Sequence, residues 1–232
     1  MPRLTYEMDM NDPAADAKRE AGVRAADLVT DGMVVGLGTG STVFFAIERL
    51  GERIQTEGLH IFGVPTSNQT AMRAEECGIP LVTLMLYPEP DLAIDGADQV
   101  DPWKRMIKGR GAAHLREKVV ANAAKQFVGV IDACKEVSCL DAAVPIEVLP
   151  FACGNVLHRL QEMGGRPTIR NGVKKDGPII SDNGNYVIDC AFGDIADPAA
   201  LEVMINNIPG VLGNGIFARF TEKTVVIVGG RK

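Results

Sequence analysis

The sequence predicts an α/β protein in which a parallel sheet with helical crossovers is followed by a small α+β insertion. Short apolar runs alternate with helical patterns in the first part of the chain, which is the order of a parallel sheet with crossovers. From Val144 the order changes to strands, a hairpin turn and helices. A final β-branched run, Thr224–Val228, is apolar enough to return as a buried strand of the first sheet.

The first predicted helix lies between Pro13 and Gly32. Asn11 or Asp12 suits the N-cap, Pro13 suits the first turn, and Gly32 suits the C-terminal cap. Small and apolar residues recur between them at intervals of three and four, and this spacing gives one narrow apolar face. These residues are Ala14, Ala17, Ala21, Ala25 and Leu28.

Five short apolar runs follow, and each ends in a loop of polar and small residues. The runs are Met33–Leu37, Leu59–Val64, Leu92–Ile94, Met106–Ile107 and Phe127–Ile131. The helical patterns that separate several of them are Thr42–Leu50, Asn68–Cys77 and Ala112–Lys125. Ligands of parallel sheets bind outside the carboxyl ends of the strands, so we expect all five loops to gather there as an active site.

The second part of the chain predicts a different arrangement. Its elements in order are a strand at Pro145–Val148, a helix at Cys153–Met163, a strand at Arg166–Arg170, a hairpin at Pro178–Ala191 and a helix at Pro198–Ile208. The residues 182–185, Asp-Asn-Gly-Asn, predict the hairpin turn because Asn-Gly tolerates positive φ.

Composition and charge limit the classes of function. The chain has 232 residues, 46% of them apolar and 23% charged, and a net charge of −6, which disfavours nucleic acid or an anionic membrane surface as a partner. The five cysteines form no C-x-x-C pair and the three histidines form no metal pattern. The N-terminal segment is too charged for a signal peptide, and no run approaches ~18 apolar residues. We therefore expect a cytoplasmic protein.

The loop Gly38–Thr42, with the sequence GTGST, follows the first run and opens a helix. Glycines let the backbone approach a ligand, and a helix N-terminus offers N–H groups to an anion. These residues suit a phosphate cradle, and they equally suit a tight turn with Ser/Thr capping. The loop lacks the P-loop lysine and the full dinucleotide spacing, so nucleotide binding is poorly supported.

Three further loops carry ionisable side chains. Asp95 and Asp98 lie three residues apart and could bind sugar hydroxyls or relay protons, although such aspartates often form turns and caps. In KGRGAAHLREK, Lys108 precedes a glycine-rich turn and a helix that bears Glu117. A carboxylate among cations at a helix N-terminus stays ionised, as a general base requires; the alternative is a charged helix facing solvent. Lys135, in DACK, suits a phosphate.

The order of these loops resembles that of the type A ribose-5-phosphate isomerases. The shared motifs are GLGTGST, VPTSNQT, DGADQVD, KGRGAAHLREK and DACK, then PIEV, RPTIRNG, SDNGN and IPGVLGNGIFA. The resemblance implies a Rossmann-like catalytic domain, residues 1–143 plus 210–232, and an inserted α+β domain, residues 144–209, as a candidate oligomer interface. It also implies a homodimer or homotetramer that uses neither a metal nor an organic cofactor.

The resemblance implies an activity and a set of site residues as well. The activity is aldose–ketose isomerisation between D-ribose 5-phosphate and D-ribulose 5-phosphate through an enediolate, in the non-oxidative branch of the pentose phosphate pathway. Glu117 matches the proton acceptor, and Asp95, Asp98 and Lys108 match the other catalytic positions. The substrate-binding positions are Thr39, Gly40, Ser41, Thr42, Asp95, Gly96, Ala97, Asp98, Lys108, Gly109, Arg110, Gly111 and Lys135.

Three residues depart from the usual pattern of that family. Gln99 stands where Glu is common, which removes a charge near the site. Arg110 replaces a frequent Gly, and its side chain would either disturb a turn with positive φ or add a cation beside the substrate. Cys134 stands where Ser is common, which questions a hydroxyl contact there.

Other functions fit parts of the pattern. An amino-sugar-phosphate deaminase or a coenzyme A transferase would use a similar fold, and the transferase would form a covalent intermediate on a carboxylate. A sugar-phosphate sensor would carry a DNA-binding module, for which there is no room before Met33. A nicotinamide dehydrogenase needs a dinucleotide glycine pattern that GTGST fits poorly.

Overall fold

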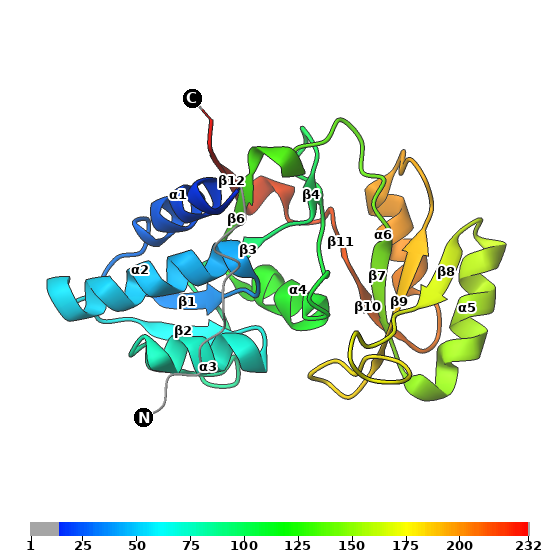
Figure 1. Cartoon of the computed structure of the whole chain (residues 1–232), viewed down its shortest axis with the longest axis horizontal. Coiled ribbons are helices and arrows are strands. Elements are labelled where there is room, and N and C mark those ends of the chain that lie inside the picture. The colour runs from blue at the N-terminus through cyan, green and yellow to red at the C-terminus, as the bar shows by residue number, and fades with distance from the viewer. Residues whose placement is uncertain (1–13, 232) are drawn as a thin grey trace. The chain divides into compact units, whose positions relative to one another are not determined.

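The computed structural model describes residues 14–231, which form two compact units (Figure 1). The first unit contains residues 14–96, Val119–Lys135 and the segment from Glu222 onward. The second unit contains Ala97–Lys118 and Glu136–Thr221. The chain therefore passes repeatedly from one unit to the other.

The first unit is built on a five-stranded parallel sheet. Its strands, in spatial order, are β12 (Thr224–Gly229), β6 (Gln126–Asp132), β3 (Leu92–Gly96), β1 (Val34–Leu37) and β2 (Phe62–Pro65). All neighbours in this sheet run parallel, and most of the strand residues are buried, as expected of a parallel sheet with both faces covered. The predicted α/β fold class and the return of the last strand are confirmed.

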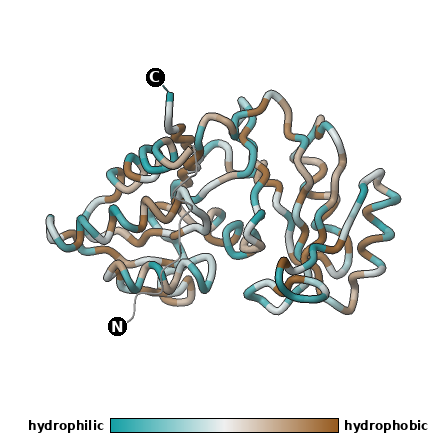
Figure 2. The backbone as a smooth tube through the Cα atoms, viewed as in Figure 1, coloured by the Kyte–Doolittle hydropathy of each residue, from teal (hydrophilic) through white to brown (hydrophobic). Residues whose placement is uncertain are grey.

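Helices flank this sheet (Figure 1). They are α1 (Ala15–Ala26), α2 (Ser41–Glu57), α3 (Asn68–Glu76) and the last turns of α4 (His114–Ala123). The core between helices and strands is apolar, and Figure 2 shows the hydrophobic colouring along the strands. Its largest fully buried side chains include Leu37, Phe44, Ile47, Leu50 and Ile94.

The predicted extent of the first helix is wrong at its C-terminal end. The helix ends at Ala26 with Asp27 as its C-cap, and Gly32 (φ 82°) lies in the turn before β1. The physical reason lies in the neighbouring helix, because Arg53 Nη1 donates to the carbonyls of Ala26 and Val29 at 2.8 Å and satisfies the end of the helix. The predicted N-cap at Asn11 or Asp12 lies outside the described residues.

One of the five predicted parallel strands is also wrong. Met106–Ile107 forms β5 in the second unit, in a three-stranded antiparallel sheet whose order is β11 (Ile216–Phe217), β5 and β4 (Gln99–Val100). A tight turn reverses the chain between β4 and β5, because the Asp101 side chain accepts the backbone N–H groups of Trp103 and Arg105. Four of the predicted loops therefore follow strands of the parallel sheet, and the lysine loop does not.

The rest of the second unit is a four-stranded antiparallel sheet with two helices. The strands, in spatial order, are β10 (Val211–Asn214), β7 (Val144–Val148), β9 (Tyr186–Ala191) and β8 (Arg166–Ile169), and the helices are α5 (Cys153–Glu162) and α6 (Pro198–Asn206). A short 3₁₀ turn occurs at Pro150–Ala152, and another at Thr221–Lys223 leads from the last residue of this unit into β12. The predicted turn is present, since Gly184 N donates to Ser181 O at 2.9 Å.

The second unit is larger than the predicted insertion. Residues 97–118, 136–143 and 210–221 belong to it as well. Pairing of β5 with β11 and the hydrogen bonds between Gln99 and Asp141 hold these segments in the unit. The predicted α+β domain at residues 144–209, with its candidate oligomer interface, stays a prediction.

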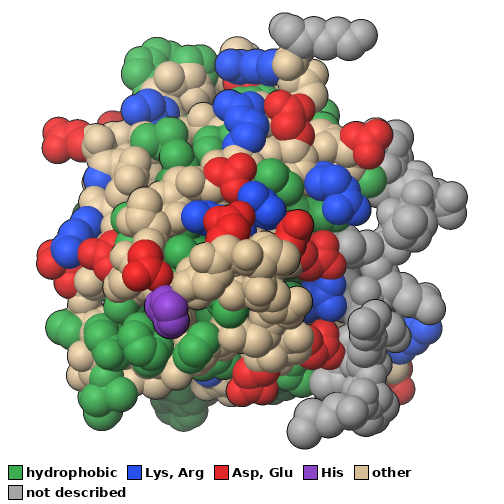
Figure 3. All heavy atoms as spheres, turned by 90° about the vertical axis from the view of Figure 1, so that its left-hand side faces the viewer, with side chains coloured by type: hydrophobic (Ala, Val, Ile, Leu, Met, Phe, Trp, Pro, Cys, Tyr) green, Lys and Arg blue, Asp and Glu red, His purple; other side chains and the backbone are tan. Residues whose placement is uncertain are grey.

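The face drawn in Figure 3 mixes charges of both signs, with apolar side chains between them. Arg49, on α2, forms ion pairs with Asp27 at 3.2 Å and with Glu52 at 3.0 Å. Exposed pairs of this kind contribute only ~0–1 kcal/mol each. Within residues 14–231, none of the helices combines the length and the hydropathy that crossing a membrane requires.

The close crossing of α1 and α2 yields a stability prediction. A Cβ atom at Gly22 would lie 2.7 Å from the carbonyl oxygen of Thr42 and 2.9 Å from the backbone nitrogen of Ala46. Gly22→Ala should therefore lower the free energy of unfolding by about 1–3 kcal/mol, measured by urea denaturation. Gly154→Ala is the matched control in α5, where an added Cβ meets nothing within 4 Å, and it should be neutral or stabilising by up to about 1 kcal/mol. Equal urea-denaturation midpoints for the two variants would contradict the close crossing of α1 and α2.

Candidate active site

The glycine loop between β1 and α2 is fitted to Asp95 on the neighbouring strand. A Cβ atom at Gly38 would lie 2.2 Å from Cγ of Asp95, so glycine is required there. The buried Asp95 carboxylate accepts the backbone N–H groups of Thr39 (3.2 Å) and Gly96 (2.7 Å) through Oδ1. Asp95 therefore fixes the path of the loop at the carboxyl end of the sheet.

Hydroxyl groups join this loop to the loop that follows β2. Thr39 Oγ1 lies 2.9 Å from Thr66 Oγ1, 2.8 Å from Ser67 Oγ and 3.0 Å from Thr70 Oγ1. The Thr70 hydroxyl also donates to the carbonyl of Gly38. The loop VPTSNQT is one of the motifs in the sequence, but Thr66, Ser67 and Thr70 are not among the predicted site residues. Their signal in the sequence is a cluster of hydroxyls directly after a buried strand.

The N-terminus of α2 has the properties of an anion site. Gly40 is its N-cap with a φ of 135°, a conformation that favours glycine, and it provides no side-chain cap. The next two residues, Ser41 and Thr42, bring hydroxyls and backbone N–H groups to the first turn. Uncapped N–H groups at a helix start attract anions.

Lys135 ends the 3₁₀ turn Ala133–Lys135 after β6, the strand beside β3. The turn is held by Asp132, whose Oδ1 accepts the backbone N–H of Cys134 at 3.1 Å and also its thiol hydrogen. The hydrogen bond to Asp132 raises the pKa of the Cys134 thiol. The Cys134 thiol thus makes a hydrogen bond within this turn.

In the second unit, Lys108 and Glu117 form a buried ion pair. Their side chains are 3% and 4% exposed, and Lys108 Nζ lies 2.9 Å from Glu117 Oε2. Lys108 follows β5, and its backbone N–H donates to Gly215 O at 2.9 Å. Glu117 lies in the first turn of α4, where the helix dipole favours a negative charge.

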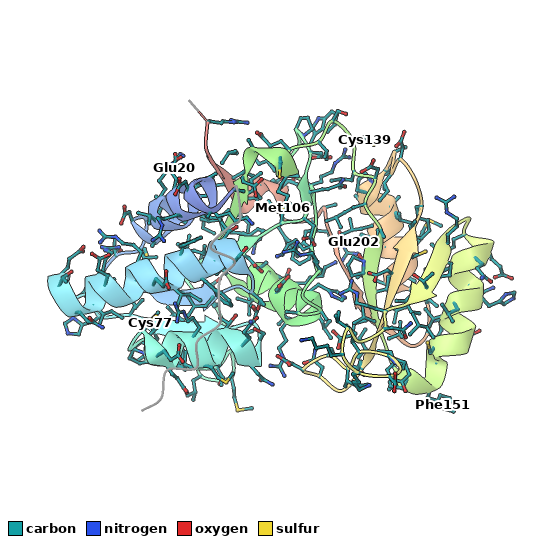
Figure 4. The ribbon with its side chains drawn as sticks, in the orientation of Figure 1. Glu20, Cys77, Met106, Cys139, Phe151 and Glu202 are labelled. Carbon is teal, nitrogen blue, oxygen red and sulfur yellow. The ribbon has the colours of Figure 1, made fainter. Side chains whose placement is uncertain are left out.

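The alternative of a charged helix that faces solvent is excluded for Glu117 by its burial. Its neighbour Lys118 is also paired within the unit, since Nζ donates at 2.6 Å to Glu202 Oε1 and to the carbonyl of Ile216. Glu202, labelled in Figure 4, extends from α6 for this contact. Arg116 donates to Asn183 Oδ1 at 2.7 Å. The three charges of this turn thus have different partners.

The residues between Lys108 and α4 form a tight loop. Gly109 has a φ of 112° and Ala112 a φ of 60°, whereas Arg110 is not among the residues with positive φ. The expected disturbance of a positive-φ turn by Arg110 is therefore absent. Asp98 Oδ2 accepts the backbone N–H of Arg110 at 3.0 Å, and Arg110 and Gly111 are exposed residues.

The two aspartates of the DGAD motif belong to different units, because the division falls between Gly96 and Ala97. The structure thus groups Thr39–Thr42, Asp95, Gly96 and Lys135 in the first unit. It groups Ala97, Asp98, Lys108–Gly111 and Glu117 in the second.

The departure at Gln99 has a structural reason. Its Nε2 donates to Asp141 Oδ1 at 2.6 Å, and its Oε1 accepts the backbone N–H groups of Asp141 and Ala142 at 3.0 and 2.9 Å. A glutamate could not donate the first of these bonds. The neutral side chain of Gln99 therefore holds the segment before β7 by hydrogen bonds to Asp141 and Ala142.

His114 is a buried neutral side chain at the start of α4. Burial is the main reason that the pKa of His114 is lowered to about 3. The positive charges of Lys118, Arg170 and Lys108 lower the pKa further, and the backbone of Gly213 opposes them. No group of three or more His, Cys, Asp or Glu side chains suited to a metal ion occurs in residues 14–231.

Comparison with known proteins gives a consistent result. The family model described as "Ribose 5-phosphate isomerase A (phosphoriboisomerase A)" matches residues 62–232. A ribose-5-phosphate isomerase A of Methanoregula boonei is 58% identical over 95% of this chain and 93% of its own length. One of Thermosynechococcus vestitus is 52% identical over 94% of this chain and 93% of its own length.

Solved structures agree with these relatives. Ribose 5-phosphate isomerase A of Methanocaldococcus jannaschii superposes with a TM-score of 0.89 at 46% identity, covering 94% of this chain and 96% of that one. A D-ribose-5-phosphate isomerase in complex with phospho-erythronic acid gives a TM-score of 0.88 at 44% identity. The match covers 91% of this chain and 93% of that one. The resemblance drawn from the loop motifs is confirmed.

The buried His114 predicts a pH dependence of stability. The unfolded chain binds a proton at this histidine near pH 6.5, whereas the folded chain does so only near pH 3. The unfolded state binds more protons between these values, so the free energy of unfolding falls as the pH falls through this window. We expect wild type to lose about 2 kcal/mol more than His114→Gln between pH 7 and pH 5, measured by urea denaturation.

His158→Gln is the control for this prediction, because His158 is 67% exposed on α5. Its stability should follow the wild-type pH dependence. Parallel losses in wild type and His114→Gln would show that His114 titrates alike in the folded and unfolded chains.

Proposed function

This chain belongs to the ribose 5-phosphate isomerase A family and isomerises ribose 5-phosphate, and we propose that Glu117 carries the proton that this reaction moves. The observation that supports this choice is the buried ion pair of Glu117 with Lys108 at 2.9 Å. An aldose–ketose isomerase needs a base for a carbon-bound proton and a positive group for the oxyanion that forms. The pair supplies one of each.

In the proposed mechanism, Glu117 takes the proton from C2 of open-chain ribose 5-phosphate. The electron pair of the broken C–H bond forms the C1–C2 double bond, and the carbonyl oxygen on C1 becomes negatively charged. Lys108 stabilises this enediolate, and a proton moves from the oxygen on C2 to the oxygen on C1. Glu117 then returns its proton to C1, which gives ribulose 5-phosphate. A glutamate performs the same role in triosephosphate isomerase.

The phosphate is assigned to residues that provide hydrogen-bond donors and a positive charge. The glycine loop Thr39–Thr42 leads into α2, which begins at Ser41, and the N-cap Gly40 has no side chain to occupy the first N–H groups of the helix. Lys135 adds a cation after β6. Binding energy from the phosphate helps to position the reacting carbons.

The remaining polar groups are assigned to the sugar. Asp95 and Asp98 orient hydroxyls and assist ring opening or the proton transfer between the oxygens, and Gly96, Ala97 and Gly109–Gly111 line the sugar as backbone contacts. We further propose that the chain acts as a homo-oligomer in the cytoplasm, in keeping with the family resemblance and the net charge of −6.

The assignment of the base is tested with Glu117→Gln, which keeps the shape of the side chain and removes its basicity. Turnover should fall ~10²–10⁴-fold, or roughly 3–5 kcal/mol of barrier, with the Michaelis constant changed far less. The measurement is NMR of ribose 5-phosphate incubated with each protein in deuterated water. Wild type should form ribulose 5-phosphate with deuterium at the reacting carbon.

Glu162→Gln is the matched control, since Glu162 is a half-exposed glutamate on α5 that pairs with Arg159. It should retain wild-type turnover, and circular dichroism should show both variants folded. Turnover by purified Glu117→Gln close to that of wild type would remove Glu117 as the base. Absence of ribulose 5-phosphate from the wild-type reaction would contradict the activity itself.

Lys135→Ala tests the phosphate assignment separately. The loss of one cation should raise the Michaelis constant about 10-fold or more, because a charged hydrogen bond contributes roughly 1.5–3 kcal/mol, with a smaller effect on turnover. Steady-state kinetics of Lys135→Ala and of the control Lys104→Ala, an exposed lysine in the turn before β5, give the comparison. An unchanged Michaelis constant would contradict the assignment.

A further inference from the structure

The loop that follows Lys108 needs support from outside itself. Its turn is closed by one internal bond, from Ala112 N to Gly109 O at 3.0 Å. Ala112 has a φ of 60°, which L-residues with a side chain rarely adopt. A loop in this conformation persists only where its surroundings hold it.

Arg170 is the main partner. It directly follows β8, and its backbone N–H donates to Val187 O at 2.8 Å. Its Nη1 donates to two successive carbonyls of the loop, those of Gly109 and Arg110, at 2.9 Å each. The opposite edge of the guanidinium donates to the carboxylate of Asp189 on β9, through Nε at 2.8 Å and through Nη2. The side chain of Arg170 is 17% exposed.

This arrangement depends on the shape of a guanidinium group. One planar group with five N–H donors binds a carboxylate on one edge and two carbonyls with another nitrogen. A lysine has a single nitrogen and cannot span both partners. Asp189 fixes the plane of the group, and Arg170 transmits that orientation to the loop.

Two other residues hold the loop at different points. Asp98 accepts the N–H of Arg110 at 3.0 Å, so the peptide groups on both sides of this residue are bonded. His114 packs beneath the turn, since a Cβ atom at Gly109 would lie 2.9 Å from its ring. The loop is thus fixed from three sides between Lys108 and the start of α4.

We infer that Arg170, oriented by Asp189, is a positioning residue that fixes the carbonyls of Gly109 and Arg110 and thereby holds Lys108 in place beside Glu117. This inference rests on the proposed function, because that function gives Lys108 and Glu117 their roles. Misplacement of a reacting group by about 1 Å can cost about 10²-fold in rate. Arg170 does not need to touch the substrate to affect turnover.

The experiment compares Arg170→Lys and Asp189→Asn with wild type by steady-state kinetics and thermal unfolding. Arg170→Lys keeps the charge and loses the double carbonyl contact, so turnover should fall ~10–100-fold at temperatures where circular dichroism shows a folded protein. Asp189→Asn should lower turnover in the same direction by a smaller factor. The Michaelis constant for ribose 5-phosphate should change by a smaller factor than turnover in both variants.

Arg159→Lys is the matched control, because Arg159 forms an ion pair with Glu162 on the surface of α5. It should leave turnover unchanged. Arg170→Ala provides a second measurement. Guanidinium ion at ~10 mM should raise the turnover of this variant several-fold over its turnover without guanidinium. Guanidinium should not raise the turnover of wild type. Rescue of this kind is expected of a missing hydrogen-bonding group and not of a general loss of stability.

Lys108→Met, assayed in parallel, separates this inference from the proposed function. An inactive Lys108→Met together with a fully active Arg170→Lys would overturn the inference and leave the function in place. An active Lys108→Met would contradict the proposed role of the lysine itself. A thermal destabilisation of Arg170→Lys without any loss of turnover, or no rescue of Arg170→Ala by guanidinium, would show that Arg170 only braces β8 and β9.

Discussion

The candidate site residues of the second unit depend on one constraint, the ion pair between Lys108 and Glu117. Both side chains are almost entirely withdrawn from water, and desolvation costs several kcal/mol for each ion. Such a pair persists only if the geometry is held and no further charge disturbs it. The position of Glu117 in the first turn of α4 helps to keep the carboxylate negative. The neutrality of His114 avoids adding a positive charge in the same apolar surroundings.

A second buried pair lies one residue further along the same helix. Lys118 binds Glu202 and the carbonyl of Ile216, and adjacent helical residues point in different directions. The start of α4 is therefore anchored by Lys118 while Glu117 remains available to Lys108. The ring of Phe217 lies within cation–π distance of both lysines, at 5.4 Å from Lys108 Nζ and 5.0 Å from Lys118 Nζ. The ring of Phe217 thus contacts both Lys108, to which a catalytic role is proposed, and Lys118, which anchors α4.

The sequence predicts local features well and tertiary ones poorly. Buried runs and crossover helices follow from periodicity, so the parallel sheet was predictable. The strand at Met106–Ile107 is only two residues long, and its antiparallel pairing depends on partners far along the chain. Gly32 is a residue type typical of a helix C-cap, but α1 ends earlier, where Arg53 from another helix donates to the carbonyl of Ala26. The charged run around Glu117 looks like a solvent-facing helix until its burial is known. Arg170 acts across 61 residues, and local patterns cannot reveal that.

The two aspartates of the DGAD motif gain a clearer meaning from their hydrogen bonds. The sequence suggests a pair that acts together on hydroxyls or protons. In the structure, Asp95 accepts backbone N–H groups of Thr39 and Gly96, while Asp98 accepts the N–H of Arg110. Each carboxylate therefore commits one oxygen to the backbone of a different loop, one loop assigned to the phosphate and one to the reacting carbons. These hydrogen bonds hold each carboxylate in a fixed orientation. The two aspartates thus orient two loops through backbone hydrogen bonds, and their contact with sugar hydroxyls is part of the proposed function.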